Sequence, residues 1–268
     1  MKKAILFFCL SLFFCCNSFA QILIDKSKEK HTVKPGDVVS GVIQVVNGGK
    51  ADADVRIYFE DFRYQKPFDG AKEFLHPGTL PSSPSPWLSY APQDVSLKPS
   101  GAQKVSYSFR VPADIKDGGY YGVLFFETLI ANPSGKAMGP KISERIGCLF
   151  FFETEKKTKK TAIEAVNVNQ GKLEADFTTA SNVIIIPGGT YYMMSEDGMV
   201  AARGEIPKLY LPPQASAPFS IVLPVKNIAD GNYSMVITFD LDDEDVLTKE
   251  IELSYKTGEG FKIVKIGE

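Results

Sequence analysis

The chain has 268 residues, of which 44 % are hydrophobic and 23 % are charged, as in an ordinary globular protein. This length suggests one large domain or two small ones. The formal net charge of −2 argues against a nucleic-acid partner, because proteins that bind nucleic acids usually carry a strong excess of basic residues.

Residues 1–20 have the pattern of a secretory signal peptide. A basic start, "KK", precedes the apolar run "AILFFCLSLFFCC", which is too short to span a membrane. Ser18 and Ala20 occupy the small-residue positions that signal peptidase needs. We therefore expect cleavage after Ala20 and an exported protein, periplasmic or extracellular at the cell surface, with no transmembrane segment in the mature chain. A lipoprotein with its lipid on Cys15 or Cys16 is the alternative, although that machinery wants a small residue just before the cysteine.

The mature sequence consists of short apolar segments that end at prolines and glycines. Examples are "VVSGVIQVVN", "VSYSFRVP" and "GYYGVLFFETLI" in the first half, and "PFSIVLPV" and "NYSMVITFDL" in the second. Turn residues that recur about every 8–12 residues are typical of an antiparallel β-sandwich. Residues 64–86 are rich in Pro, Gly and Ser and are predicted to form a long surface loop. No 15-residue stretch keeps a 3.6-residue period, so we expect little helix.

A charged segment without apolar residues, 156–161, is the predicted linker between two domains. It separates a first domain at 21–155 from a second domain at 162–268. Three of the four cysteines lie in the signal segment, and only Cys148 remains. The mature protein therefore has no internal disulfide and is expected to be held by its cores alone.

One motif occurs twice. "IKDGGYYGVLFF" at 115–126 returns 113 residues later as "IADGNYSMVITF" at 228–239, with six of twelve positions identical. In each copy a strand that ends in proline is followed by Asp-Gly-x-Tyr and a strongly apolar strand. This order is typical of the E–F corner of an immunoglobulin-like sandwich, where a tyrosine hydroxyl often bonds upstream backbone. We interpret Tyr120 and Tyr233 as structural corner residues, and we predict an all-β chain of two tandem immunoglobulin-like β-sandwich domains.

The sequence assembles no catalytic or metal-binding constellation. It has two histidines and lacks H-x-x-H, a nucleophile elbow, a phosphate loop and a dinucleotide fingerprint. Cys148 lies in the apolar "GCLFFFE", whereas a catalytic cysteine needs an exposed, electropositive setting, so we interpret it as a buried structural thiol. The acidic run 240–245 lacks the glycine and the final glutamate of an EF-hand, which favours a solvated turn over a calcium site. We expect a non-enzymatic protein without cofactor or metal.

Residues 142–152 alternate between two faces, as a strand does. One face is apolar except for a glutamate: Ile142, Glu144, Ile146, Cys148, Phe150 and Phe152. The other face carries Ser143, Arg145, Gly147, Leu149 and Phe151. A half-buried strand keeps its outer face polar, so Leu149 and Phe151 predict that something covers both faces at this end. The cover is either the second domain or a partner strand or surface, since exposed strands with apolar rows accept or lend a strand.

The segment "SPSPWLSYAPQDVSLKPSGAQKVSYSFRVPADIKDGGYYGVLFF" resembles bacterial secreted Ig-like domains, including the peptidoglycan-binding domain of WxL-interacting surface proteins. The two-sandwich layout and "RIGCLFFFE" on the last strand of the first domain resemble periplasmic pilus-assembly chaperones. In that family this strand supports a pilin subunit by strand complementation, and two basic residues in the interdomain cleft anchor the subunit's terminal carboxylate. The resemblance implies Lys28 and Arg145 as the anchors, although Gly147 replaces the lysine expected after "RI".

These observations predict a non-enzymatic exported protein that resembles a pilus chaperone. It is expected to bind a protein partner, a pilin-like subunit or a surface protein, through the edge strand or interdomain cleft of its first domain. The alternative is a cell-envelope or surface adaptor that binds peptidoglycan, a cell-wall polymer, or another surface protein. The candidate partner-binding residues are Lys28, Arg145, Ile146, Cys148, Leu149, Phe150 and Phe151.

Overall fold

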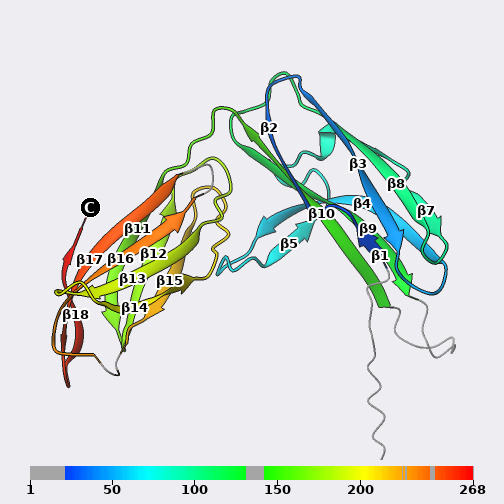
Figure 1. The fold of residues 1–268 in the computed structure, drawn as a ribbon. Coiled ribbons are helices and arrows are strands. Elements are labelled where there is room, and N and C mark those ends of the chain that lie inside the picture. The colour runs from blue at the N-terminus through cyan, green and yellow to red at the C-terminus, as the bar shows by residue number, and fades with distance from the viewer. Residues whose placement is uncertain (1–21, 131–141, 225, 227, 242–244, 268) are drawn as a thin grey trace, which may run out of the picture.

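This computed structural model describes residues 22–130, 142–224, 226, 228–241 and 245–267 (Figure 1). The expected signal peptide, and residues 242–244 of the acidic run, lie outside the described residues. No helix in the described ranges is long and apolar enough to cross a membrane.

Two facing sheets form the first sandwich, coloured blue to green in Figure 1. The smaller sheet has the strand order β1 (Ile22–Ile24), β3 (Val38–Asn47), β8 (Ala102–Arg110) and β6 (Leu88–Ala91). The larger sheet has the order β2 (Lys28–Val33), β10 (Ile142–Thr154), β9 (Gly119–Ile130), β4 (Ala53–Tyr64) and β5 (Lys72–Leu75), with β7 (Asp94–Leu97) also paired to β4.

Two further sheets form the second sandwich. One has the order β11 (Thr161–Asn169), β12 (Lys172–Thr179) and β15 (Ser216–Val222). The other has the order β14 (Val200–Ile206), β13 (Gly188–Ser195), β16 (Gly231–Asp240), β17 (Val246–Lys256) and β18 (Gly260–Ile266). Within the described ranges the only helical segment is the short 3-10 helix η1 (Ser85–Trp87). The predicted all-β fold with two tandem sandwiches is confirmed.

The alternation of apolar and polar residues explains why these segments form strands, and it appears in the structure as alternating burial. In β8 the side chains of Val105, Tyr107 and Phe109 are buried, and more exposed residues stand between them. The Phe109 ring faces the opposite sheet, where its centroid lies 4.9 Å from that of Phe150 and 4.6 Å from that of Phe152. The core of the first sandwich therefore includes aromatic rings from both sheets, with Phe109 from β8 and Phe150 and Phe152 from β10.

The N-terminal segment changes from one sheet to the other. β1 pairs antiparallel with β3, whereas β2 pairs in parallel with β10, with Lys28 beside Leu149. Asp25 holds the crossover: its N–H donates to the Gln44 carbonyl at 3.2 Å, and its Oδ1 accepts from the Gln44 N–H at 2.8 Å. As a result, among the described residues β10 has a parallel neighbour only from Leu149 onward.

The segment 64–86 is more structured than a long surface loop, so that prediction is wrong for part of it. It contains β5 and the start of η1, and the Phe68 side chain is only 7 % exposed. The buried carboxylate of Asp61 in β4 accepts hydrogen bonds from the Leu80 N–H, at 2.9 Å, and from the Ser83 hydroxyl. Polar loop groups thus find a buried acceptor, which a sequence rich in turn residues does not reveal.

The two repeated tyrosines lie at matching corners. The Tyr120 hydroxyl donates to the Lys116 carbonyl at 3.0 Å, and the Tyr233 hydroxyl donates to the Ala229 carbonyl at 2.7 Å. Each bond reaches four residues upstream, at the start of β9 and of β16 respectively. This is the geometry of a tyrosine corner, in which the hydroxyl fixes the turn between two strands.

Candidate partner-binding site

The strand β10 has an edge that is paired along only part of its length. It pairs with β9 from Ile142 to Glu153, but with β2 only from Leu149 to Thr154. No strand within the described ranges pairs with residues 142–148 on the side opposite β9. Such an edge presents backbone donors and acceptors that another strand can use.

The direction of the backbone groups along this edge follows from one hydrogen bond. The Leu149 N–H donates to the Ser27 carbonyl at 3.0 Å, on the β2 side of the strand. Backbone groups of alternate residues in a strand point to alternate neighbours. The N–H and C=O groups of Ser143, Arg145 and Gly147 therefore point toward the open side, and those of the residues between them point toward β9.

Two of the expected partner-binding side chains belong to the core instead. Cys148 and Phe150 are fully buried between the two sheets, so in the folded state neither side chain reaches a surface. Ile146 is half-buried and packs against the same core. This corrects the expectation that these two side chains are accessible: along this strand the inward face packs the core, and only the edge and the outward face remain candidates for binding.

The outward face is covered from both sandwiches. Phe151 is only 4 % exposed, and its ring centroid lies 5.9 Å from that of Phe62 and 5.6 Å from that of Tyr121, both in the first sandwich. Ile184 of the second sandwich lines the small hollow beside Phe151. Leu149 is half-buried against the same hydrophobic cluster. The second domain, one of the two covers considered from the sequence, thus contributes one part of a larger hydrophobic layer.

Arg145 and Lys28, the two expected anchors, are not brought together. The Arg145 guanidinium lies over the Phe125 ring, 4.3 Å from its centroid, and its Nη1 is 3.2 Å from a Glu60 carboxylate oxygen. Lys28 lies beside Leu149, four residues further along β10, which is a separation of about 13 Å along a strand. Arg145 therefore stands at the open edge, whereas Lys28 stands at the cleft.

The presence of glycine at position 147 of β10 has a steric explanation. A Cβ atom at this position would lie 2.6 Å from the Val123 Cγ2 atom and 3.0 Å from the Phe125 ring. Both side chains belong to β9 and lie across the backbone of β10 at this point. The residue that replaces the lysine of the pilus-chaperone pattern is therefore the only kind that fits under these two side chains.

A small hollow between the sandwiches carries three lysines that face it from two segments. It is lined by Lys28, Lys30, Phe151, Glu153, Lys159, Ile184, Ile186 and Leu241. Lys28 is exposed, and its Nζ lies 5.0 Å from the centroid of the Phe151 ring. No carboxylate within the described ranges forms an ion pair with Lys28. In the sequence, the spacing of Lys28 and Lys30 indicates that both lysines lie on one face of a strand. Their position beside the hollow follows only from the parallel pairing of β2 with β10.

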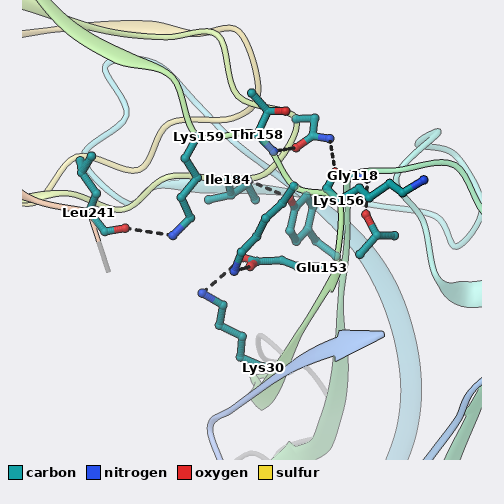
Figure 2. A network of polar contacts seen from close by, with 12 residues as sticks. Lys30, Gly118, Glu153, Lys156, Thr158, Lys159, Ile184 and Leu241 are labelled. Atoms are coloured by element: carbon teal, nitrogen blue, oxygen red, sulfur yellow. Dashed lines mark hydrogen bonds and ion pairs between the residues drawn. The ribbon is translucent and has the colours of Figure 1, made fainter. Parts of the chain in front are cut away.

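Glu153 is a buried residue whose carboxylate lines this hollow (Figure 2). The Lys30 Nζ lies 3.3 Å from its Oε1, and the Lys157 Nζ lies 3.0 Å from its Oε2. A buried carboxylate needs such compensation, because removing a charge from water is costly. Nearby, the Lys159 Nζ donates to the Leu241 carbonyl at 3.2 Å and so ties the linker to the second sandwich.

Asn182 joins the linker and both sandwiches. Its side-chain Oδ1 accepts from the Thr158 N–H at 2.8 Å, and its carbonyl accepts from the Gly119 N–H at 3.0 Å. Two residues later the Ile184 N–H donates to the Tyr121 hydroxyl at 2.8 Å (Figure 2). Burial raises the pKa of Tyr121 above its ordinary value, so the hydroxyl stays neutral. These bonds fix the linker end of the cleft.

The thiol of Cys148 is expected to be unreactive in the native protein. Burial raises its pKa to about 12, and its side chain has no exposed area. At pH 8 a maleimide reagent should leave the folded mature chain unlabelled, and complete labelling should follow unfolding in guanidinium chloride. Intact-mass spectrometry measures both states. Rapid labelling of the folded protein would contradict the assignment of this thiol to the core.

No protein-family model matches the chain, and no curated protein matches it. Solved structures of fimbrial chaperones are similar to it. A chain from a chaperone–tip adhesin complex of CFA/I fimbriae biogenesis has 14 % identity and a TM-score of 0.50, covering 85 % of this chain and 97 % of that chain. The class 5 fimbriae chaperone CfaA has 14 % identity and a TM-score of 0.49, with the same coverage of 85 % and 97 %. The E. coli chaperone DraB has 10 % identity and a TM-score of 0.45, covering 85 % and 96 %.

The fold therefore defines a class: the two-domain architecture of periplasmic pilus-assembly chaperones, shared over most of this chain. The likeness concerns the arrangement of the two sandwiches.

Proposed function

We propose that this protein is an exported, non-enzymatic chaperone that binds a pilin-like subunit through the open edge of β10 and the neighbouring cleft. One observation carries the proposal: among the described strands, none pairs with the outer edge of β10 at Ser143, Arg145 and Gly147, and the same strand then lines a lysine-bearing hollow at Phe151 and Glu153. The similarity of fold to a chain from a chaperone–adhesin complex supports it.

The first half of the proposed binding mode is strand addition. An incoming strand of the partner pairs with the backbone groups of Ser143, Arg145 and Gly147, which point away from β9. It occupies the lateral position that β2 takes from Leu149 onward. Main-chain hydrogen bonds then supply affinity, and side chains on alternate positions supply specificity.

The second half is capture of a carboxylate at Lys28. The neighbouring Lys30 and Lys157 already hold Glu153, whereas Lys28 is exposed and forms no ion pair within the described ranges. Its ammonium lies over the Phe151 ring, in a partly apolar setting that strengthens a charge-assisted hydrogen bond. We propose that a carboxylate at the end of the partner chain binds this ammonium while the partner strand lies along β10.

The decisive experiment removes a backbone N–H at the open edge of β10 and keeps the hydrogen bonds between β10 and β9. Arg145→Pro removes one donor that points to the open side, and proline is tolerated on edge strands. Arg145→Ala removes the same side chain but keeps the donor. With a pilin-like subunit co-expressed in the periplasm, we expect the proline variant to bind about tenfold more weakly than the alanine variant, the equivalent of about one hydrogen bond.

Titration of the purified proteins, with circular dichroism as the check of folding, measures this difference. Equal affinity of the two folded variants would contradict strand addition. Lys28→Met and amidation of the partner's C-terminus should each weaken binding, and together they should weaken it no further than either alone. Retention of the protein on purified peptidoglycan, with no affinity for the subunit, would favour the envelope adaptor instead.

A further inference from the structure

The hairpin of β4 and β5 reaches from the first sandwich to the second (Figure 1). At its turn, the Phe68 carbonyl accepts a hydrogen bond from the Tyr210 N–H of the second sandwich at 2.8 Å. The Phe68 side chain is 7 % exposed and belongs to a hydrophobic cluster that also contains Leu209. The turn is therefore anchored both by a backbone bond and by a buried ring.

The side chains around Tyr210 strengthen this contact. The Tyr64 and Tyr210 ring centroids lie 5.1 Å apart. The Lys72 Nζ lies 5.0 Å from the first ring and 5.9 Å from the second, within the range of cation–π attraction. Gly70 comes so close that a Cβ atom there would lie 3.0 Å from the Tyr210 ring. The hairpin therefore packs closely against the Tyr210 side chain.

The backbone of the turn also has an unusual conformation. Phe68 has φ 70°, in the left-handed region that residues other than glycine and asparagine rarely adopt. A bulky residue in this region is strained unless its surroundings hold it there. Here the turn bond from the Phe68 N–H to the Gln65 carbonyl, at 2.8 Å, the buried ring and the bond from Tyr210 together hold this conformation.

Two separate places thus connect the sandwiches. One is the linker with Asn182 and Glu153, and the other is the hairpin turn at Phe68 with Tyr210. Domains joined by a linker alone are expected to move relative to each other. A second contact blocks every rotation about the first except rotation about the axis through both, and the hydrophobic cluster that residues of both sandwiches share opposes that one.

We infer that the β4–β5 hairpin is an interdomain strut that holds the two sandwiches at a fixed angle, so that the cleft beside Lys28 is already formed before a partner binds. The statement about the partner rests on the proposed function, whereas the fixed angle concerns the free protein alone.

Two variants test the strut. Phe68→Gly removes the buried ring but suits the left-handed backbone, so the turn can keep its shape. Tyr210→Ala removes the ring against which the hairpin packs. Tyr192→Ala, an exposed tyrosine of the same sandwich at 47 % exposure, is the matched control. Small-angle X-ray scattering and differential scanning calorimetry are recorded on the free exported protein.

We expect Phe68→Gly and Tyr210→Ala to increase the radius of gyration and to split one thermal transition into two. The control should keep the wild-type scattering curve and a single transition. Scattering curves of both variants that match the wild type would overturn the strut. Because no partner is present, this result is independent of the proposed function. Titration with the pilin-like subunit then tests the preformed cleft: both variants should bind several-fold more weakly, and unchanged affinity in a loosened variant would overturn that part.

Discussion

Phe150→Ala is expected to destabilise the first sandwich by about 3–5 kcal/mol, the usual loss when a buried phenylalanine is truncated. The Phe150 side chain has no exposed area and packs against the rings of Tyr107 and Phe109, with centroids 4.9 Å away in both cases. A domain has only about 5–15 kcal/mol of stability in total, so this single change removes a large share. Chemical denaturation followed by circular dichroism measures it.

The neighbouring Leu149→Ala is the matched comparison. Its side chain lies on the outer face and is half-buried, so we expect a loss of about 1–2 kcal/mol, in proportion to the area buried. A loss for Phe150→Ala no greater than that for Leu149→Ala would contradict the inward placement of Phe150. A partner-binding defect of Phe150→Ala at working temperature must therefore be compared with its folded fraction before it is assigned to contact.

Gly147→Lys is expected to destabilise the protein by about 1–3 kcal/mol, the usual cost of overpacking, even though it restores the lysine of the pilus-chaperone pattern. The new Cβ would meet the Val123 methyl at 2.6 Å and the Phe125 ring at 3.0 Å. Relief of this contact requires Phe125 to move, and with it the guanidinium of Arg145 that lies over the ring. The melting temperature should fall accordingly.

Ser143→Lys places the same side chain on the same face of β10, at an exposed position beside Glu127. Substitutions at exposed positions usually change stability by no more than about 0.5 kcal/mol. Comparing the melting temperatures of the two variants thus separates the effect of adding a lysine to this face from the effect of filling the space at position 147. If both variants melt together with the wild type, the steric explanation of Gly147 is wrong.

The sequence predicted the architecture well because a strand pattern depends on local residues. Alternating burial, frequent turn residues and the repeated Asp-Gly-x-Tyr corner are all visible within a dozen residues. The corner hydroxyls of Tyr120 and Tyr233 bond the backbone four residues upstream, so their whole environment lies within one short segment. Local patterns of this kind need no knowledge of which strands become neighbours.

The site was harder to predict because it depends on register between distant segments. Arg145 belongs to β10 and Lys28 to the neighbouring β2, but the pairing of Lys28 with Leu149 separates the two basic residues along the strand. The buried Glu153 and its partner Lys30 come together through the same parallel pairing. Two segments more than one hundred residues apart leave no sequence signal of their relative register.

The hairpin contact was missed for a related reason. Residues 64–86 have the composition of a loop, and composition indicates where a chain turns, not where the turn is buried. Phe68 was the one signal, as a large ring amid turn residues. Its burial becomes evident only once the second sandwich is in place with Tyr210 against it.

The crossover at Asp25, which lies outside β10, determines how many residues of β10 belong to the proposed binding edge. Because β2 runs parallel to β10, each further residue of β2 toward the N-terminus would occupy one more position among residues 142–148. The two hydrogen bonds of Asp25 to Gln44 direct the chain to the other sheet before that happens. The length of strand offered to a partner is thus adjustable by mutations at the crossover, which leave the side chains of β10 untouched.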